Sequence, residues 1–285
     1  HVRKAFQGWL KAKYGSADAL RAAWNNPAID FDSVVVPGRA ERYDLGRGTF
    51  RDPAKKMNVI DFYQFYNDIV PETIDYFARI AKETIQGHKV VGAFYGYMYE
   101  FRGDPEYGHN ALKRYNESKY LDFIFVTASY DNRAFASGGD YSRAPAHSVQ
   151  LHGKLWFDEN DIRTSLSGGK IGEWGRPADV AGDLLQQDKE LANVITNGAA
   201  QWWFDVGSNK YNDPVLMDRI AHLTTAADQA LGLDRAPKDE VALVVDEDSL
   251  RYLKVGDAMG THLLLRQLPS LQRIGAPVGH YLTSD

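Results

Sequence analysis

Four short apolar stretches, each followed by a segment with helical periodicity, constrain the fold of this chain more than any other feature. The stretches cover residues 90–96, 123–126, 154–157 and 199–204, and helical patterns occupy 111–119, 145–152, 178–193 and 214–231. Such alternation is typical of a parallel sheet whose strands are joined by crossover helices. The sequence therefore predicts an α/β fold. Four such units fit half of an eight-stranded barrel and also part of an open doubly wound sheet.

Helical segments come before the first of these strands. The spacing of apolar residues predicts helices over 2–13, 17–24 and 59–86. Ser16 is placed to cap the second helix, and Pro71 is a candidate break in the third. Residues 25–57, rich in proline, glycine and charge, are expected to form a long surface excursion.

The last fifty residues predict a second α/β unit. Residues 233–239 have the composition of a linker, and 240–245 form a β-branched, apolar strand. A helix is expected over 257–274 and the start of another strand at 280–282. We therefore expect a first domain over 1–232 and the beginning of a second over 240–285.

Composition and missing motifs exclude several classes of function. The net charge of −5 gives no sign of nucleic-acid or membrane-surface binding, and no apolar run reaches the ~20 residues that span a bilayer. The absence of cysteine excludes disulfides and thiolate chemistry. Nucleotide loops and histidine pairs typical of metal sites are also missing, so we expect no cofactor and no metal. The chain starts at His1 inside a helical pattern, which leaves its cellular compartment open.

Polar and aromatic side chains follow every predicted strand. They are Tyr95 and Tyr97 after the first strand, Tyr130, Asp131 and Asn132 after the second, Asp158 to Asp161 after the third, and Trp203 and Asp205 after the fourth. Because the carboxyl ends of parallel strands meet at one edge of a sheet, these groups are expected to gather there. Carboxylates, amides and aromatic rings together suit a polyol ligand.

The third strand end carries the strongest signal for chemistry. Three acids stand within four positions in Asp158-Glu159-Asn160-Asp161, and glycoside hydrolysis requires a pair of carboxylates. Two structural alternatives remain open at this point. Asp158 or Asp161 could cap the next helix, and Glu159 could form an ion pair with Arg163.

The N-terminal segment carries a resemblance to a known family. Residues 6–15, Phe-Gln-Gly-Trp-Leu-Lys-Ala-Lys-Tyr-Gly, together with Ala19-Leu20 and Ala23-Trp24, resemble a segment of family 42 β-galactosidases and their clan A relatives. The resemblance implies a (β/α)₈ TIM barrel, of which this chain holds strands five to eight. It also implies that 240–285 begins a flavodoxin- or amidotransferase-like domain used for trimer formation.

The same resemblance assigns roles to candidate residues. It implies a retaining glycosidase acting on a β-galactoside or related carbohydrate, with Glu159 as nucleophile and Tyr130 as the residue that orients it. Trp203, rather than Trp202, is expected to lie under the sugar. Sugar hydroxyls are expected to be bound by Asp131, Asn132, Asn160, Asp205, Tyr95 and Tyr97.

The catalytic acid/base of this family would lie upstream of His1, so the 285 residues alone are expected to be inactive. The two carboxyl groups of a retaining pair stand ~5–5.5 Å apart. Two other functions remain open. One is a non-catalytic carbohydrate-binding protein on a degenerate barrel, and the other is a metal-dependent hydrolase built on the acids of 158–161.

Overall fold

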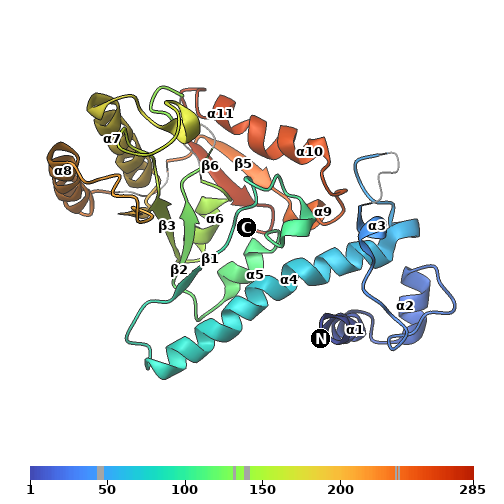
Figure 1. The fold of residues 1–285 in the computed structure, drawn as a ribbon. Coiled ribbons are helices and arrows are strands. Elements are labelled where there is room, and N and C mark those ends of the chain that lie inside the picture. Colours follow the sequence, from blue (N-terminus) through green and yellow to red (C-terminus); the bar gives the residue numbers. More distant parts are fainter. Residues whose placement is uncertain (44–47, 131–132, 138–141, 235, 237) are drawn as a thin grey trace.

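A computed structural model describes residues 1–285 except 44–47, 131–132, 138–141, 235 and 237. Its centre is a parallel sheet of β1 (Gly92–Phe94), β2 (Phe123–Thr127), β3 (Leu155–Asn160) and β4 (Ala200–Trp203), hydrogen-bonded in chain order (Figure 1). Crossover segments with helices α5 (Leu112–Glu117), α6 (Ala146–Leu151) and α7 (Val180–Thr196) join the strands, and α8 (Pro214–Ala230) follows the last. The predicted α/β fold with a parallel sheet is confirmed.

The two faces of this sheet differ in chemistry. Ile124, Val126 and Trp156 are buried in a core with residues of α5, α6 and α7. Their strand neighbours point the opposite way, because successive side chains alternate between faces. On that opposite face, which we call the aromatic face, the rings of Phe94, Phe123, Phe125, Phe157 and Trp202 form a chain of contacts with centroids 4.5–5.9 Å apart.

The third strand is longer than the sequence pattern indicates. We predicted a strand over 154–157 followed by a polar loop, but β3 continues to Asn160. Asp158 pairs with Val126, and Glu159 pairs with Thr127. The prediction failed because apolar character ends at Phe157, whereas backbone pairing continues for three polar residues that are almost fully buried.

A long helix supports the N-terminal part of the molecule. Helices α1 (Val2–Tyr14) and α2 (Ala17–Ala23) lie against the N-terminal half of α4 (Pro53–Thr84), with the short α3 (Arg39–Arg42) nearby (Figure 1). Ser16 caps α2 as predicted, since its hydroxyl accepts from the backbone N–H of Ala19. The candidate break at Pro71 is wrong: α4 passes through it, and the only non-helical backbone inside α4 is at Lys56.

One buried carboxylate joins these helices. Asp61 on α4 has no exposed surface, and it accepts hydrogen bonds of 2.7 Å each from Lys13 Nζ, Tyr14 Oη and Trp24 Nε1. Lys13 and Tyr14 belong to the last turn of α1, and Trp24 directly follows α2. Both helices are therefore fixed to α4 by one charged group as well as by aromatic packing. A buried charge is tolerated when it is paired and hydrogen-bonded in this way.

The C-terminal residues form a second parallel sheet, of β5 (Val241–Val245) and β6 (Val278–Leu282). Between these strands lie the short helical segments α9 (Glu247–Leu250), α10 (Ala258–Gly260), η3 (Thr261–Arg266) and α11 (Leu268–Leu271), where a single helix was predicted. Two further short turns are η1 (Pro105–Tyr107) and η2 (Glu173–Gly175). Within the described ranges, none of the helices combines the length and apolar character needed to cross a membrane.

The second sheet is attached to the first part of the chain by polar contacts as well as by shared apolar packing. The Glu247 carboxylate accepts from the backbone N–H groups of Leu112 (2.7 Å) and Lys113 (3.2 Å), at the start of α5. Burial raises the pKa of Glu247 to about 7. On the other side, the backbone N–H of His280 donates to Nδ1 of His147 at 3.0 Å, so this nitrogen carries no proton.

These two histidines contribute stability that is lost in mild acid, whereas Glu247, whose pKa is raised, contributes in the opposite direction. Burial lowers the pKa of His280 to about 4 and also lowers that of His147. Because an unfolded histidine titrates near 6.5, the unfolded chain takes up protons first, and stability present above about pH 6.5 is lost as the pH falls toward 4. We expect His280 to account for about 2 kcal/mol of unfolding free energy between pH 7 and 5, measured by urea denaturation.

The matched variants are His280→Phe, which should gain about 2 kcal/mol of unfolding free energy at pH 5 relative to pH 7 when compared with the unmodified protein, and His222→Gln, an exposed histidine on α8, which should leave the pH dependence unchanged. An unchanged pH dependence in His280→Phe would contradict the assignment.

Candidate active site

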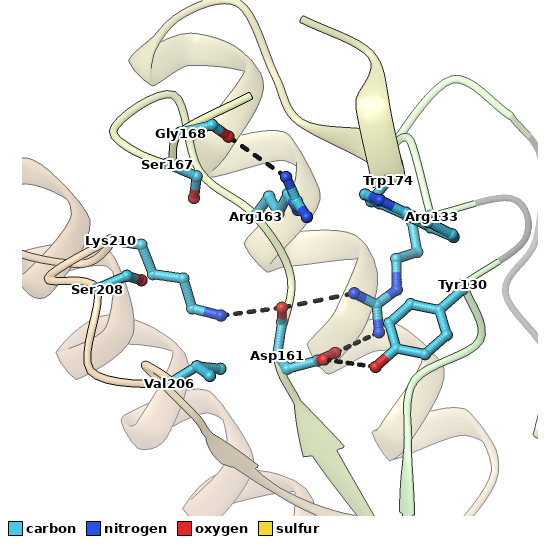
Figure 2. Close-up of a pocket in the computed structure, with 10 residues that line it drawn as sticks. All are labelled: Tyr130, Arg133, Asp161, Arg163, Ser167, Gly168, Trp174, Val206, Ser208 and Lys210. Atoms are coloured by element: carbon cyan, nitrogen blue, oxygen red, sulfur yellow. Dashed lines mark hydrogen bonds and ion pairs between the residues drawn. The ribbon is translucent and has the colours of Figure 1, made fainter. Parts of the chain in front are cut away.

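A pocket of about 550 Å³ lies at the carboxyl ends of β2, β3 and β4 (Figure 2). Its walls come from three loops, and the lining residues are Tyr130, Arg133, Asp161, Arg163, Ser167, Gly168, Trp174, Val206, Ser208 and Lys210. This volume is in the range of small-molecule sites, and the strand ends are the edge where parallel α/β folds place them. The predicted gathering of polar groups at this edge is therefore present, although with partly different residues.

Glu159 lies near this edge on the aromatic face. Glu159 is two residues after Phe157 on β3, so both side chains point to the same face of the sheet. In the strand register it pairs directly with Trp202 of β4. Only 7% of Glu159 is exposed. The alternative of an ion pair with Arg163 does not hold, because that guanidinium contacts Glu173 at 3.8 Å and the carbonyl of Gly168 at 3.3 Å.

The same register separates the two adjacent tryptophans. Trp203 pairs with Asn160 and therefore lies on the helix-covered face, where its ring is 5.9 Å from Tyr211 and beside residues of α7 and α8. Trp202 lies on the aromatic face, with its ring 4.6 Å from Phe125. The place beside Glu159 that we predicted for Trp203 is occupied by Trp202.

Asp161 is the centre of the polar network in the pocket. Its carboxylate forms an ion pair with Arg133 and accepts from the Tyr130 hydroxyl at 3.1 Å (Figure 2). The centre of the Tyr130 ring is 4.1 Å from the guanidinium of Arg133 and 4.3 Å from that of Arg143. Tyr130 was expected to hydrogen-bond Glu159, but its hydroxyl is held by Asp161, two residues further along the chain.

The charges around Glu159 act in opposite directions. Burial raises the pKa of Glu159 above its ordinary value, and the carboxylate of Asp161 raises it further. The indole N–H of Trp202, the ammonium of Lys210 and the guanidinium of Arg143 lower this pKa. Glu159 is thus a buried carboxyl whose protonation is set by one neighbouring anion and by cations from two loops.

Two tyrosines at the end of the first strand were predicted to bind the sugar, and of these Tyr97 lies near Glu159. Its ring is 5.2 Å from the Arg143 guanidinium. Burial raises the pKa of Tyr97, and the negative charge of Glu159 contributes to the same shift.

Three other predicted residues do not reach the pocket. Tyr95 is fully buried on the helix side, stacked on Tyr115 at 5.4 Å. Asn160 is also buried, with its amide donating to Gln201 across to β4. Asp205 accepts the backbone N–H groups of Asn209 and Lys210 and so closes the turn after β4. Asp131 and Asn132 lie outside the described residues.

The acids of 158–161 do not converge on a common point. Asp158 faces the helices, where its carboxylate accepts from the Trp156 indole at 3.1 Å, while Glu159 faces the opposite side. Neither Asp158 nor Asp161 caps a helix, since the next one, α7, is capped by Asp179. In the described part of the chain, no three histidine, cysteine or carboxylate side chains are arranged to hold a metal ion.

Several residues in and around the site were not singled out from the sequence, among them three cations and a tryptophan. Arg133 and Arg143 come from the loop after β2, Lys210 comes from the turn after β4, and Trp202 is the neighbour of the chosen tryptophan. Position after a strand end was an available signal for the three cations. Cations do not by themselves indicate a polyol site, for which carboxylates and aromatic rings are the typical signals.

The fold and the site define an α/β protein with a buried glutamate and a cation-lined pocket at the carboxyl edge of a parallel sheet. Residues 1–145 match the sequence model of glycoside hydrolase family 42, described as beta-galactosidase. The chain belongs to this family.

Two individual proteins are similar to this chain in sequence or in fold. The beta-galactosidase BbgII of Bifidobacterium bifidum is 22% identical over 268 residues, which are 86% of this chain and 36% of that protein. The crystal structure of beta-galactosidase from the psychrophilic Marinomonas ef1 has a similar fold, with a TM-score of 0.61 and 16% identity over all of this chain and 46% of that one. The chain thus spans about a third to a half of the length of these proteins.

The electrostatic coupling within the site can be tested with Asp161→Asn. Removing this negative charge also leaves Arg133 unneutralised, so both effects favour the ionised form of Glu159 and its pKa should fall. Carboxyl ¹³C NMR titration of glutamate-labelled protein measures the change. Asp18→Asn, at an exposed carboxylate, is the matched control. A rise in the pKa of Glu159, or an equal change in the control, would contradict the coupling.

Proposed function

We propose that this chain forms the nucleophile-bearing part of a retaining, β-galactosidase-like glycosidase, in which Glu159 attacks the anomeric carbon. The observation that carries the proposal is the placement of Glu159, which is buried at the carboxyl edge of a parallel sheet and paired in register with Trp202. Family membership supports a carbohydrate substrate. The family match ends at residue 145, so the role of Glu159 rests on its geometry.

The mechanism assigns separate tasks to the residues around Glu159. Attack requires the ionised carboxylate, which Lys210, Arg143 and the Trp202 indole N–H favour. In the first step a second carboxylic acid protonates the leaving oxygen, so that the aglycone departs as an alcohol while Glu159 forms the glycosyl-enzyme ester. The carboxylate that this acid becomes then removes a proton from the water that hydrolyses the ester. Tyr130 acts indirectly, because it holds Asp161 and the two arginines in place beside Glu159. Trp202 supplies a flat apolar surface next to the nucleophile.

The four-stranded sheet would be part of a larger barrel. The four strands in unbroken chain order would be strands five to eight of a (β/α)₈ barrel, and the aromatic face would be its interior. Partial exposure of Phe94 (47%) and Leu155 (39%) on this face supports the idea that further strands cover it. Residues 240–285 would begin an amidotransferase-like domain, through which the whole protein forms a trimer.

Trapping of the intermediate tests the nucleophile directly. An activated 2-deoxy-2-fluoro-β-galactoside should label the full-length protein covalently, and mass spectrometry of peptides should place the label on Glu159. Glu159→Gln should lower kcat by ~10³-fold or more, because the amide cannot form the ester intermediate.

Glu83→Gln, at an exposed glutamate of α4, is the control and should keep full activity. Labelling of another residue, or undiminished turnover in Glu159→Gln, would refute the assignment of the nucleophile. Sugar binding without any labelling would instead support the non-catalytic carbohydrate-binding protein.

The two neighbouring tryptophans give a matched pair of substitutions. Trp202→Ala should raise KM for an aryl β-galactoside about fivefold, because it removes the apolar surface beside Glu159. Trp203→Ala should leave the kinetics of the folded enzyme unchanged and lower the unfolding free energy by about 3 kcal/mol, since Trp203 packs on Tyr211 and on α7 and α8. Steady-state kinetics and urea denaturation measure both. The reverse pattern would place the sugar against Trp203.

A further inference from the structure

The pocket beside Glu159 has an excess of positive charge. Arg133, Arg163 and Lys210 line it, whereas Asp161 is its only carboxylate among the described residues. Neutral sugars are usually bound by hydroxyls, amides and carboxylates, so three cations in one sugar-sized pocket need a separate explanation.

Asp161 is already neutralised by other groups. Its carboxylate is held by Arg133 and by the Tyr130 hydroxyl. Lys210 reaches the backbone carbonyl of Asp161, at 2.9 Å, and not its carboxylate (Figure 2). The one anion of the pocket is therefore shared between Arg133 and Tyr130, and Lys210 has no ionic contact with it.

Lys210 is consequently a buried cation with incomplete bonding. Only 3% of the residue is exposed, and its ammonium lies 5.4 Å from the centre of the Tyr211 ring. Within the described ranges this ammonium makes a single hydrogen bond, although it has three N–H donors. Burial lowers its pKa to about 8, against the opposing influence of Asp161 and Asp205. Both carboxylate oxygens of Asp205 are engaged by backbone N–H groups of the turn.

Arg163 provides a second cation on the adjoining loop. Its nearest carboxylate is that of Glu173, at 3.8 Å, and about a third of the Arg163 side chain is exposed (34%). Figure 2 shows Arg163 and Lys210 extending from separate loops around the same open space, with Ser167 and Ser208 beside them. A group bound there would be reached by charge-assisted donors from the loops after β3 and β4.

We propose that this pocket binds a negatively charged substituent of the sugar, a carboxylate or a sulfate, with Lys210 and Arg163 as its ligands. The substrate class is then an anionic β-galactoside, such as a galacturonide or a sulfated galactoside. This assignment rests on the proposed function for the reaction, but binding of the anionic sugar does not depend on which residue is the nucleophile.

The kinetic experiment uses the full-length protein and three 4-nitrophenyl glycosides: the β-galactoside, the β-galacturonide and the 6-sulfated β-galactoside. Wild-type kcat/KM should be ~tenfold or more higher for at least one anionic glycoside than for the neutral one, as a charge-assisted hydrogen bond predicts. The better of the two anionic compounds identifies the substituent. Lys210→Met should lower kcat/KM for all three compounds, because Lys210 also favours the ionised form of Glu159, but the decrease should be ~tenfold or more larger for that anionic compound than for the neutral one.

Two controls separate charge from structure. Lys210→Arg keeps the charge and should retain most of the preference, whereas Lys55→Met removes an exposed lysine of α4 and should change nothing. A wild-type preference for the neutral glycoside, or an equal loss for all three substrates in Lys210→Met, would overturn the proposal.

A binding experiment separates this inference from the proposed reaction. Calorimetric titration of Glu159→Gln with galacturonate, galactose 6-sulfate and galactose should show tighter binding of an anionic sugar, and Lys210→Met in that background should abolish the difference. If Glu159→Gln keeps full turnover while this preference persists, the nucleophile assignment fails and the anion site stands. If binding shows no preference for charge, the anion site fails whatever the role of Glu159.

Discussion

The site depends on the parallel register between β3 and β4. Pairing of Glu159 with Trp202, and of Asn160 with Trp203, determines which side chains share the aromatic face and which face the helices. Because side chains alternate along a strand, a slip of one residue would exchange these sets and bury the carboxylate among apolar side chains of α7 and α8. The ring contacts of Phe157 with Phe125 and Trp202 oppose such a slip, since they require this pairing.

Electrostatic balance is the second constraint. Glu159 is buried beside the anion Asp161, which disfavours its charge, and near Lys210 and Arg143, which favour it. Lys210 is in turn deprived of solvent in the pocket. Burial therefore disfavours the charged form of both Glu159 and Lys210. A bound anionic ligand would supply a counter-charge for Lys210.

The sequence predicted the order of strands and helices, because apolar runs and helical patterns record burial directly. The resemblance of the segment within residues 6–24 indicated the family. The sequence misjudged the end of β3, where backbone pairing rather than apolar character continues the strand through Asn160. It also chose Trp203 over Trp202 and assigned Tyr130 to Glu159. Those choices depend on register and on loop geometry, which contacts distant in sequence determine. Arg143, for example, contacts the rings of Tyr130 and Tyr97, although it lies thirteen and forty-six residues after them in the sequence.

The buried Asp61 has a consequence for the way the N-terminal helices come apart. If α1 or α2 detached from α4 alone, the carboxylate would lose a donor while remaining within apolar surroundings of Phe62 and Phe65. That intermediate state carries the cost of a partly uncompensated charge. The two helices and the first half of α4 are therefore expected to open together as one cooperative unit. Their slowly exchanging backbone amides should show similar protection factors.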